Sequence, residues 1–262
     1  MDESGQTDLS GKKIFFLHPS AVIQNEVAAE LTQQEFEIYL IKDHDALKRA
    51  LKRYPCSVVF ADIDERMSEK DWEAWIRGVM NDPETAAVKI GILSVNDDEN
   101  LRRKYINMVR VEAGYTVLKA DLSSSVRQIL EILKTAGAKG RRKYIRAVTD
   151  NDAMTTINLP FNGTYVNGVI RDISVVGLSC AFDEDPGLAK NTLFQNIQIK
   201  LQSALLKVEG IVFGSRMDGL AKIYVILFTN RTDSEVKVKI RKYMQQNLQT
   251  KMDKGLGEHP KP

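Results

Sequence analysis

Residues 171–179 read RDISVVGLS and join the end of one predicted strand to the start of the next. The surrounding β-rich segments, separated by Gly, Asn, Asp or Ser, are 155–160, 165–171, 178–182, 193–201, 205–214 and 222–229. Six short strands in succession predict a compact antiparallel β-barrel. Residues 236–248 place apolar side chains on one helical face, which predicts a helix that closes the barrel.

The part of the chain that precedes this region has a different pattern of apolar residues. Short apolar runs occur at 13–17, 37–41, 57–61, 88–93 and 115–118. Amphipathic stretches alternate with them, at 21–31, 45–53, 69–80, 99–109 and 123–133. The alternation predicts an α/β domain with a mainly parallel sheet and crossover helices. Ser123, Ser124 and Ser125 are expected to supply the N-cap of the last helix.

The two patterns meet at residues 135–140, TAGAKG, whose small residues are expected to end a helix and loosen the chain. We therefore predict an α/β domain at 11–137 followed by a β-barrel domain at 138–249. Residues 250–262 contain glycines, prolines and scattered charges, and we expect them to form a disordered tail.

The composition restricts the range of functions. Lys and Arg number 37 against 35 Asp and Glu, so no global field attracts nucleic acid, and any anion site must be local. The polar, acidic start lacks the pattern of a signal peptide, and no apolar run is long enough for a membrane span, which predicts a cytoplasmic protein. Cys56 and Cys180 have no pairing or metal-ligand spacing and are expected to be reduced core residues.

Catalysis is not expected from this sequence. His18, His44 and His259 form neither a metal-binding nor a nucleophile–base pattern, so we predict no catalytic residues, no metal and no cofactor. Asp62 and Asp64 could pass for an acid–base pair, but residues two apart at a strand end serve more often as loop caps.

The best candidate anion site is the junction between the two domains, where Arg141, Arg142 and Arg146 stand close together. A guanidinium suits phosphate because its planar fork donates two parallel hydrogen bonds, and it also stacks on flat rings. Asp172 and Ser174, two apart on a strand, would point to one side and could bond the edge of a guanine, while Gly177 allows a turn or close approach. Alone, the first group reads as a solvated charge run and the second as an ordinary turn.

Together and in this order, the two groups resemble the motifs of PilZ domains, a family of receptors for the bacterial second messenger cyclic di-GMP. The Arg-x-x-x-Arg motif reads RRKYIRA at 141–147, and the Asp/Asn-x-Ser-x-x-Gly motif reads RDISVVGLS at 171–179. The resemblance covers about 139–248 and implies that Arg142 and Arg146 clamp the ligand while Asp172, Ser174 and Gly177 shape a guanine pocket. It implies a further contact for Arg141, and roles in motility, adhesion, biofilm formation or virulence.

The first domain resembles a response-regulator receiver, which implies a flavodoxin-like fold with a site at the carboxyl ends of its strands. Asp62, Ser94 and Lys119 follow the third, fourth and fifth strands, where that resemblance places the phosphoacceptor, the switch hydroxyl and the phosphate-binding lysine. His18 and Pro19 stand where receivers carry an acidic pair that helps to hold Mg²⁺. We therefore interpret this domain as a degenerate receiver that binds partners or forms dimers.

Three classes of function follow from these readings. The leading hypothesis is a cyclic di-GMP effector that changes its domain arrangement and its contact with a downstream protein, as a monomer or homodimer. The second is a response regulator controlled by phosphorylation of Asp62, with the barrel as its output, and labelling by a small phosphodonor separates the two. The third, an enzyme, would require nucleotide turnover by the purified protein.

Overall fold

The computed structural model describes residues 11–64, 66–149 and 152–257. Contacts within this part of the chain divide it into two compact units. The first unit comprises 11–143 and 249–257, and the second comprises 144–248. Each unit is built on one sheet, parallel in the first and antiparallel in the second.

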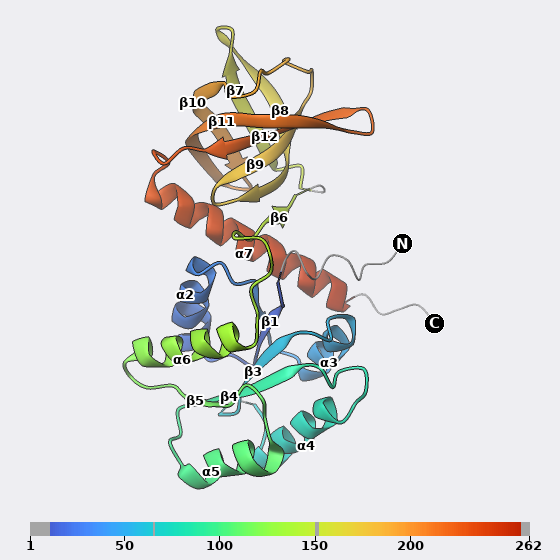
Figure 1. Ribbon diagram of the computed structural model, residues 1–262, viewed down its shortest axis with the longest axis vertical. Coiled ribbons are helices and arrows are strands. Elements are labelled where there is room, and N and C mark those ends of the chain that lie inside the picture. The colour runs from blue at the N-terminus through green and yellow to red at the C-terminus, as the bar shows by residue number, and fades with distance from the viewer. Residues whose placement is uncertain (1–10, 65, 150–151, 258–262) are drawn as a thin grey trace. The chain divides into compact units, whose positions relative to one another are not determined.

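The sheet of the first unit has five parallel strands in the order β2-β1-β3-β4-β5 (Figure 1). The strands are β1 Ile14–Leu17, β2 Ile38–Ile41, β3 Val58–Asp62, β4 Lys89–Ser94 and β5 Tyr115–Val117. The helices are η2 Ile23–Val27, α2 Ala28–Gln33, α3 His44–Arg53, α4 Glu69–Met80, α5 Glu99–Arg103, η3 Lys104–Val109 and α6 Leu122–Thr135. This strand order is that of flavodoxin-like folds, as the resemblance to a receiver implied.

The central strands of this sheet are buried on both faces. Every residue of β1 and β3 is buried, which explains why these strands read as continuous apolar runs. Helices η2, α2 and α6 cover one face with Ile23, Leu31 and Ile129, and Figure 1 shows α3 and α4 on the other side. Trp72 of α4 is fully buried within this unit.

Two local expectations for this unit, on the cap of α6 and on Cys56, were wrong. Asp121 rather than a serine caps α6, because its carboxylate accepts the Ser123 N–H at 3.1 Å. Helix α6 ends at Thr135, as expected, and in the segment that follows it Ala138 is buried and its carbonyl accepts the Lys12 N–H at 2.8 Å. Cys56 is exposed in a turn, whereas Cys180 is buried and both cysteines are free.

The second unit is a closed antiparallel barrel. Six strands follow each other in the order β8-β7-β10-β11-β12-β9, and a β8–β9 pairing closes the ring. They are β7 Thr155–Phe161, β8 Thr164–Ser174, β9 Gly177–Phe182, β10 Leu193–Leu201, β11 Ala204–Asp218 and β12 Ala221–Phe228. All six were predicted, and a two-residue strand that was not predicted, β6 Ala147–Val148, adds to β8.

The helix after the barrel is α7 Ser234–Gly257. Ile240, Tyr243 and Met244 join the barrel core, and the Tyr243 hydroxyl lies 3.0 Å from Thr155 Oγ1. The helix runs beyond the predicted end at 248, so the expectation of disorder from 250 onward is wrong for 250–257. Tertiary contacts within the first unit hold these turns, because Met252 is buried and the Gln249 side chain bonds both backbone groups of Leu40. Residues 258–262 of the expected tail lie outside the described part of the chain.

A helix that crosses a bilayer needs about 20 predominantly apolar residues, a requirement of length and hydropathy alone that applies to the helices of residues 11–64, 66–149 and 152–257. None of the helices in the described ranges is at once long enough and apolar enough to cross a membrane.

Candidate functional site

Strand β6 places Arg146 beside the second motif. Ala147 pairs with Ile173 and Val148 with Asp172, so this short strand continues the sheet at the end of β8. Thr149 extends the pairing, because its N–H donates to the Arg171 carbonyl at 2.8 Å. Arg146, the residue directly before β6, is thereby brought to a motif that lies 26 residues further along the chain.

Asp172 is the centre of this arrangement. Arg146 Nη1 lies 3.5 Å from Asp172 Oδ1, and the Ser179 hydroxyl donates a hydrogen bond to the other carboxylate oxygen. The Arg146 side chain remains 49% exposed, against 21% for Asp172. The site therefore combines an anchored carboxylate with a guanidinium that is open to an incoming anion.

Ser174 and Gly177 shape the turn between β8 and β9. The Ser174 hydroxyl donates to the Gly177 carbonyl at 3.1 Å and accepts the Val176 N–H at 3.4 Å. A Cβ on Gly177 would lie 2.5 Å from the carbonyl oxygen of Ile226 on β12, so only glycine fits there without a shift. In this structure both residues serve the barrel itself, by closing a turn and by admitting a neighbouring strand.

The remaining arginines of the first motif belong to the other unit. Arg141 and Arg142 are exposed and belong to the first unit, whereas Arg146 belongs to the barrel unit. Within a single unit, the structure therefore brings together Arg146, Asp172, Ser174 and Gly177.

Asp62 lies at the carboxyl end of β3, where a receiver-like site is expected. Its side chain is only 2% exposed, and burial raises the pKa of its carboxyl group above the ordinary value. One carboxylate oxygen accepts the Ser20 N–H at 3.0 Å, and the other accepts the Asp64 N–H at 3.4 Å. Asp62 thus holds together the loops that follow β1 and β3.

The residues that follow β4 and β5 are also engaged in local contacts. The buried Ser94 hydroxyl donates to Asp64 Oδ1 at 2.7 Å, and Asp64 Oδ2 accepts the Val95 N–H at 2.6 Å. Asp64 is therefore a loop cap, as its spacing from Asp62 suggested. Lys119 is exposed after β5, and its backbone N–H donates to the Ser125 hydroxyl at 3.2 Å.

An aromatic cluster lies after β1, at the position where a receiver would carry its acidic pair. The ring of the buried His18 lies 5.7 Å from the Trp72 ring, edge to face, and 5.9 Å from the His44 ring. Trp75 packs edge to face on Trp72 at 6.2 Å. The residues at this corner are therefore suited to packing rather than to holding Mg²⁺, which prefers oxygen ligands.

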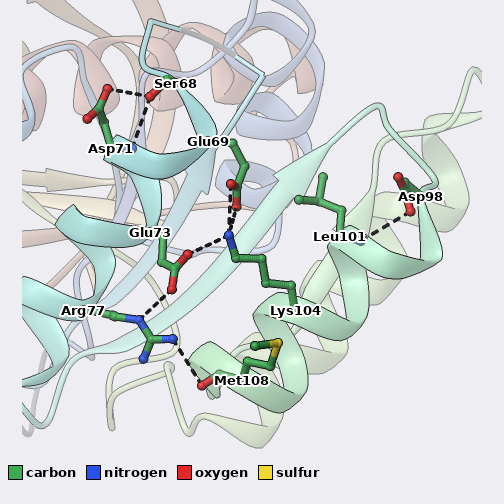
Figure 2. A network of polar contacts seen from close by, with 9 residues as sticks. All are labelled: Ser68, Glu69, Asp71, Glu73, Arg77, Asp98, Leu101, Lys104 and Met108. Carbon is green, nitrogen blue, oxygen red and sulfur yellow. Dashed lines mark hydrogen bonds and ion pairs between the residues drawn. The ribbon is translucent and has the colours of Figure 1, made fainter.

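The helix that carries Trp72 is tied to its neighbour by charged side chains, as Figure 2 shows. Lys104 of η3 lies 2.7 Å from Glu69 and 2.6 Å from Glu73 of α4. Arg77 bonds Glu73 within α4 and reaches the Met108 carbonyl at 3.4 Å. The network links α4 to η3 and so supports the helix that packs against His18.

Two parts of the barrel site, Ser179 and strand β6, were not predicted from the sequence. Ser179 lies inside the quoted motif segment but was not singled out, although an alternating strand pattern places it on the same face as Gly177. Strand β6 has two residues and carries no periodic signal of its own. Strand β6 is identified only from its pairing with β8 in the structure.

Comparison with solved structures finds two kinds of neighbour, each matched over less than half of this chain. The PilZ domain of YcgR from Escherichia coli, solved with c-di-GMP, is 12% identical with a TM-score of 0.39, and the match covers 45% of this chain and 99% of that one. The MrkH–c-di-GMP complex from K. pneumonia is 17% identical with a TM-score of 0.40, over 45% of this chain and 57% of that one.

The other kind of neighbour is a receiver domain. The signal receiver domain of an HD domain-containing protein from Pseudomonas fluorescens Pf-5 is 13% identical with a TM-score of 0.39, and the match covers 48% of this chain and 97% of that one. No protein-family model matches the sequence. No curated protein matches it either.

Proposed function

We propose that the chain is a non-catalytic effector that binds cyclic di-GMP on the barrel surface beside Asp172. The two sequence motifs support this proposal, because they resemble the paired motifs of PilZ domains and occur in the same order. Arg142 and Arg146 then hold the phosphates and the faces of the bases, with a further contact from Arg141. The edge of a guanine, which carries N–H donors, is recognised by the carboxylate of Asp172.

The observation that carries the proposal is the position of Arg146. The pairing of β6 with β8 sets its guanidinium 3.5 Å from Asp172, although the two residues are 26 apart in sequence. A half-exposed ion pair of this kind stabilises a protein by only about 0.2–1 kcal/mol. Arg146 can therefore turn from Asp172 to a phosphate at little cost, while Asp172 becomes available to a guanine.

The energy that such a site offers suits a second messenger. Micromolar affinity corresponds to about −8 kcal/mol, and a charge-assisted hydrogen bond contributes about 1.5–3 kcal/mol. Two arginines and one carboxylate, supplemented by stacking on the bases, are sufficient to reach this range.

Titration calorimetry with the full chain tests the proposal directly. We expect saturable binding of cyclic di-GMP in the micromolar range and much weaker binding of GMP, which lacks the second phosphate and the second base. Cyclic di-AMP serves as a control for recognition of the guanine edge by Asp172. Absence of saturable heat with cyclic di-GMP would overturn the proposed function.

We further propose that binding changes the arrangement of the two units and thereby the contact with a downstream protein. Residues 139–143 are largely exposed and join the units, so arginines that close on a ligand also reorganise this connection. Small-angle X-ray scattering of the full chain is expected to change at saturating cyclic di-GMP. Identical profiles with and without ligand, in a sample shown to bind, would contradict the rearrangement but not the binding.

A further inference from the structure

A row of exposed aliphatic side chains crosses the outer surface of the barrel. Leu193 of β10 pairs with Ile211 of β11, and Ile211 pairs with Leu227 of β12. Directly opposed residues of neighbouring strands present their side chains on the same face. Leu193, Ile211 and Leu227 are 48%, 38% and 40% exposed, so together they form an apolar strip open to solvent.

The strip leads to the proposed ligand site. Leu227 pairs with Gly177 of β9, and Gly177 pairs with Ser174 of β8, which continues the same row across five strands. The intervening residues of these strands face the core, since Ile173, Leu178, Ile226 and Val212 are at most 2% exposed. The row therefore lies on the outer face, where side chains two residues away share its side.

The next row on this face is polar at one end. Asp172 pairs with Ser179, Ser179 with Val225, and Val225 with Gly214. Asp172 and Ser174 are two residues apart on β8, so the carboxylate bonded to Arg146 and the aliphatic row belong to adjacent rows of one surface. A ligand held at Asp172 that extends toward β12 would pass over Ser179 to Val225, and Leu227 lies two residues from Val225 in the adjacent row.

Each of these two rows contains a glycine, which adds no side chain to the surface. The Cβ position of Gly177 lies 3.2 Å from Leu227 Cδ2, so the leucine covers the glycine rather than standing beside a second side chain. A Cβ on Gly214 would meet nothing within 4 Å, which leaves an open place beside Val225. An apolar surface next to a carboxylate and a guanidinium is complementary to a purine, which has apolar faces and a polar edge.

We propose that Leu227 and Ile211 form a platform on which one purine base of the bound nucleotide packs, while Arg146 approaches that nucleotide from the Asp172 side. This inference rests on the proposed function and adds the residues that hold the face of a base. Burial of the aliphatic surface by the base contributes to affinity, because apolar area is removed from water on both partners.

Calorimetry with cyclic di-GMP on Leu227→Ser and Ile211→Ser tests the platform. We expect each substitution to lower the affinity by about tenfold, since loss of a buried aliphatic contact is typically of this size. Leu227→Met keeps an apolar side chain and is expected to bind as the parent does. Leu205→Ser is the matched control, because Leu205 is 67% exposed on β11 but pairs with Lys200, outside the row.

The possible outcomes separate the platform from the function on which it rests. If the parent binds and both serine variants bind equally well, the platform is wrong and the ligand site stands. If the parent does not bind, the proposed function fails first. If the serine variants keep their affinity but abolish self-association in sedimentation, the row belongs to an interface between copies of this chain, which overturns the inference. Circular dichroism of each variant shows whether the barrel is folded, and Ile211→Ser keeps the test valid should Leu227→Ser unfold.

Discussion

Replacement of Arg146 by alanine is expected to lower the affinity for cyclic di-GMP by more than tenfold. The substitution removes a phosphate ligand and also leaves Asp172 without the cation that lies 3.5 Å away, so the uncompensated carboxylate repels the incoming phosphates. Arg142→Ala is also expected to lower the affinity for cyclic di-GMP by more than tenfold, because it removes the second guanidinium of the motif. Titration calorimetry on the full chain measures both changes.

A conservative substitution of Arg146 and a substitution of a distant arginine show whether the affinity depends on the geometry of the guanidinium or on net charge alone. Arg146→Lys keeps the charge but loses the planar fork, so we expect an affinity between those of the parent and the alanine variant. Arg102→Ala removes an exposed arginine from α5 of the first unit and is expected to leave binding unchanged. Equal losses in Arg102→Ala and Arg146→Ala would show that net charge alone governs the affinity and would contradict the assigned site.

The sequence predicted the strands of both units well because their signals are local. The apolar runs of β1 and β3 coincide with fully buried strands, and the helical spacing at 69–80 coincides with α4 from end to end. The errors arose where a distant contact decided the outcome. The last turns of α7 have weak helical patterning, yet Gln249 and Met252 hold them through the backbone of Leu40 and through burial in the first unit.

The candidate site was predicted in part for the same reason. Arg146 and Asp172 were recognised as chemically suited to one anionic ligand, but their closeness depends on β6, which two residues cannot signal in advance. Gly177 was predicted to serve a turn or a close approach, and the structure shows that the approaching group is the backbone of β12. Which strands become neighbours in a barrel is a property of the whole closed ring and is not encoded in any one segment.

Gly177→Ala is expected to destabilise the barrel by about 1–3 kcal/mol, the usual cost of forcing an extra carbon into a packed site. The added Cβ would lie 2.5 Å from the Ile226 carbonyl oxygen and 3.1 Å from the Leu227 Cα, and both neighbours are backbone atoms that cannot rotate away. Relief therefore requires β9 and β12 to separate at the residues where they pair. Hydrogen exchange of the β12 amides reports this loss, because amides of a weakened strand pair open more often.

Two features of the chain make this experiment specific. Gly214→Ala is the matched control, because its Cβ would meet nothing within 4 Å, and we expect a change within about 0.5 kcal/mol. Both tryptophans, Trp72 and Trp75, lie in the first unit, so their fluorescence follows the unfolding of that unit while hydrogen exchange follows the barrel. If Gly177→Ala abolished binding of cyclic di-GMP with no change in β12 exchange, the glycine would be required by the ligand rather than by the strand pair. A joint loss of protection and affinity would instead mean that this glycine acts on the ligand through the barrel, by holding Leu227 and the β8–β9 turn in their places.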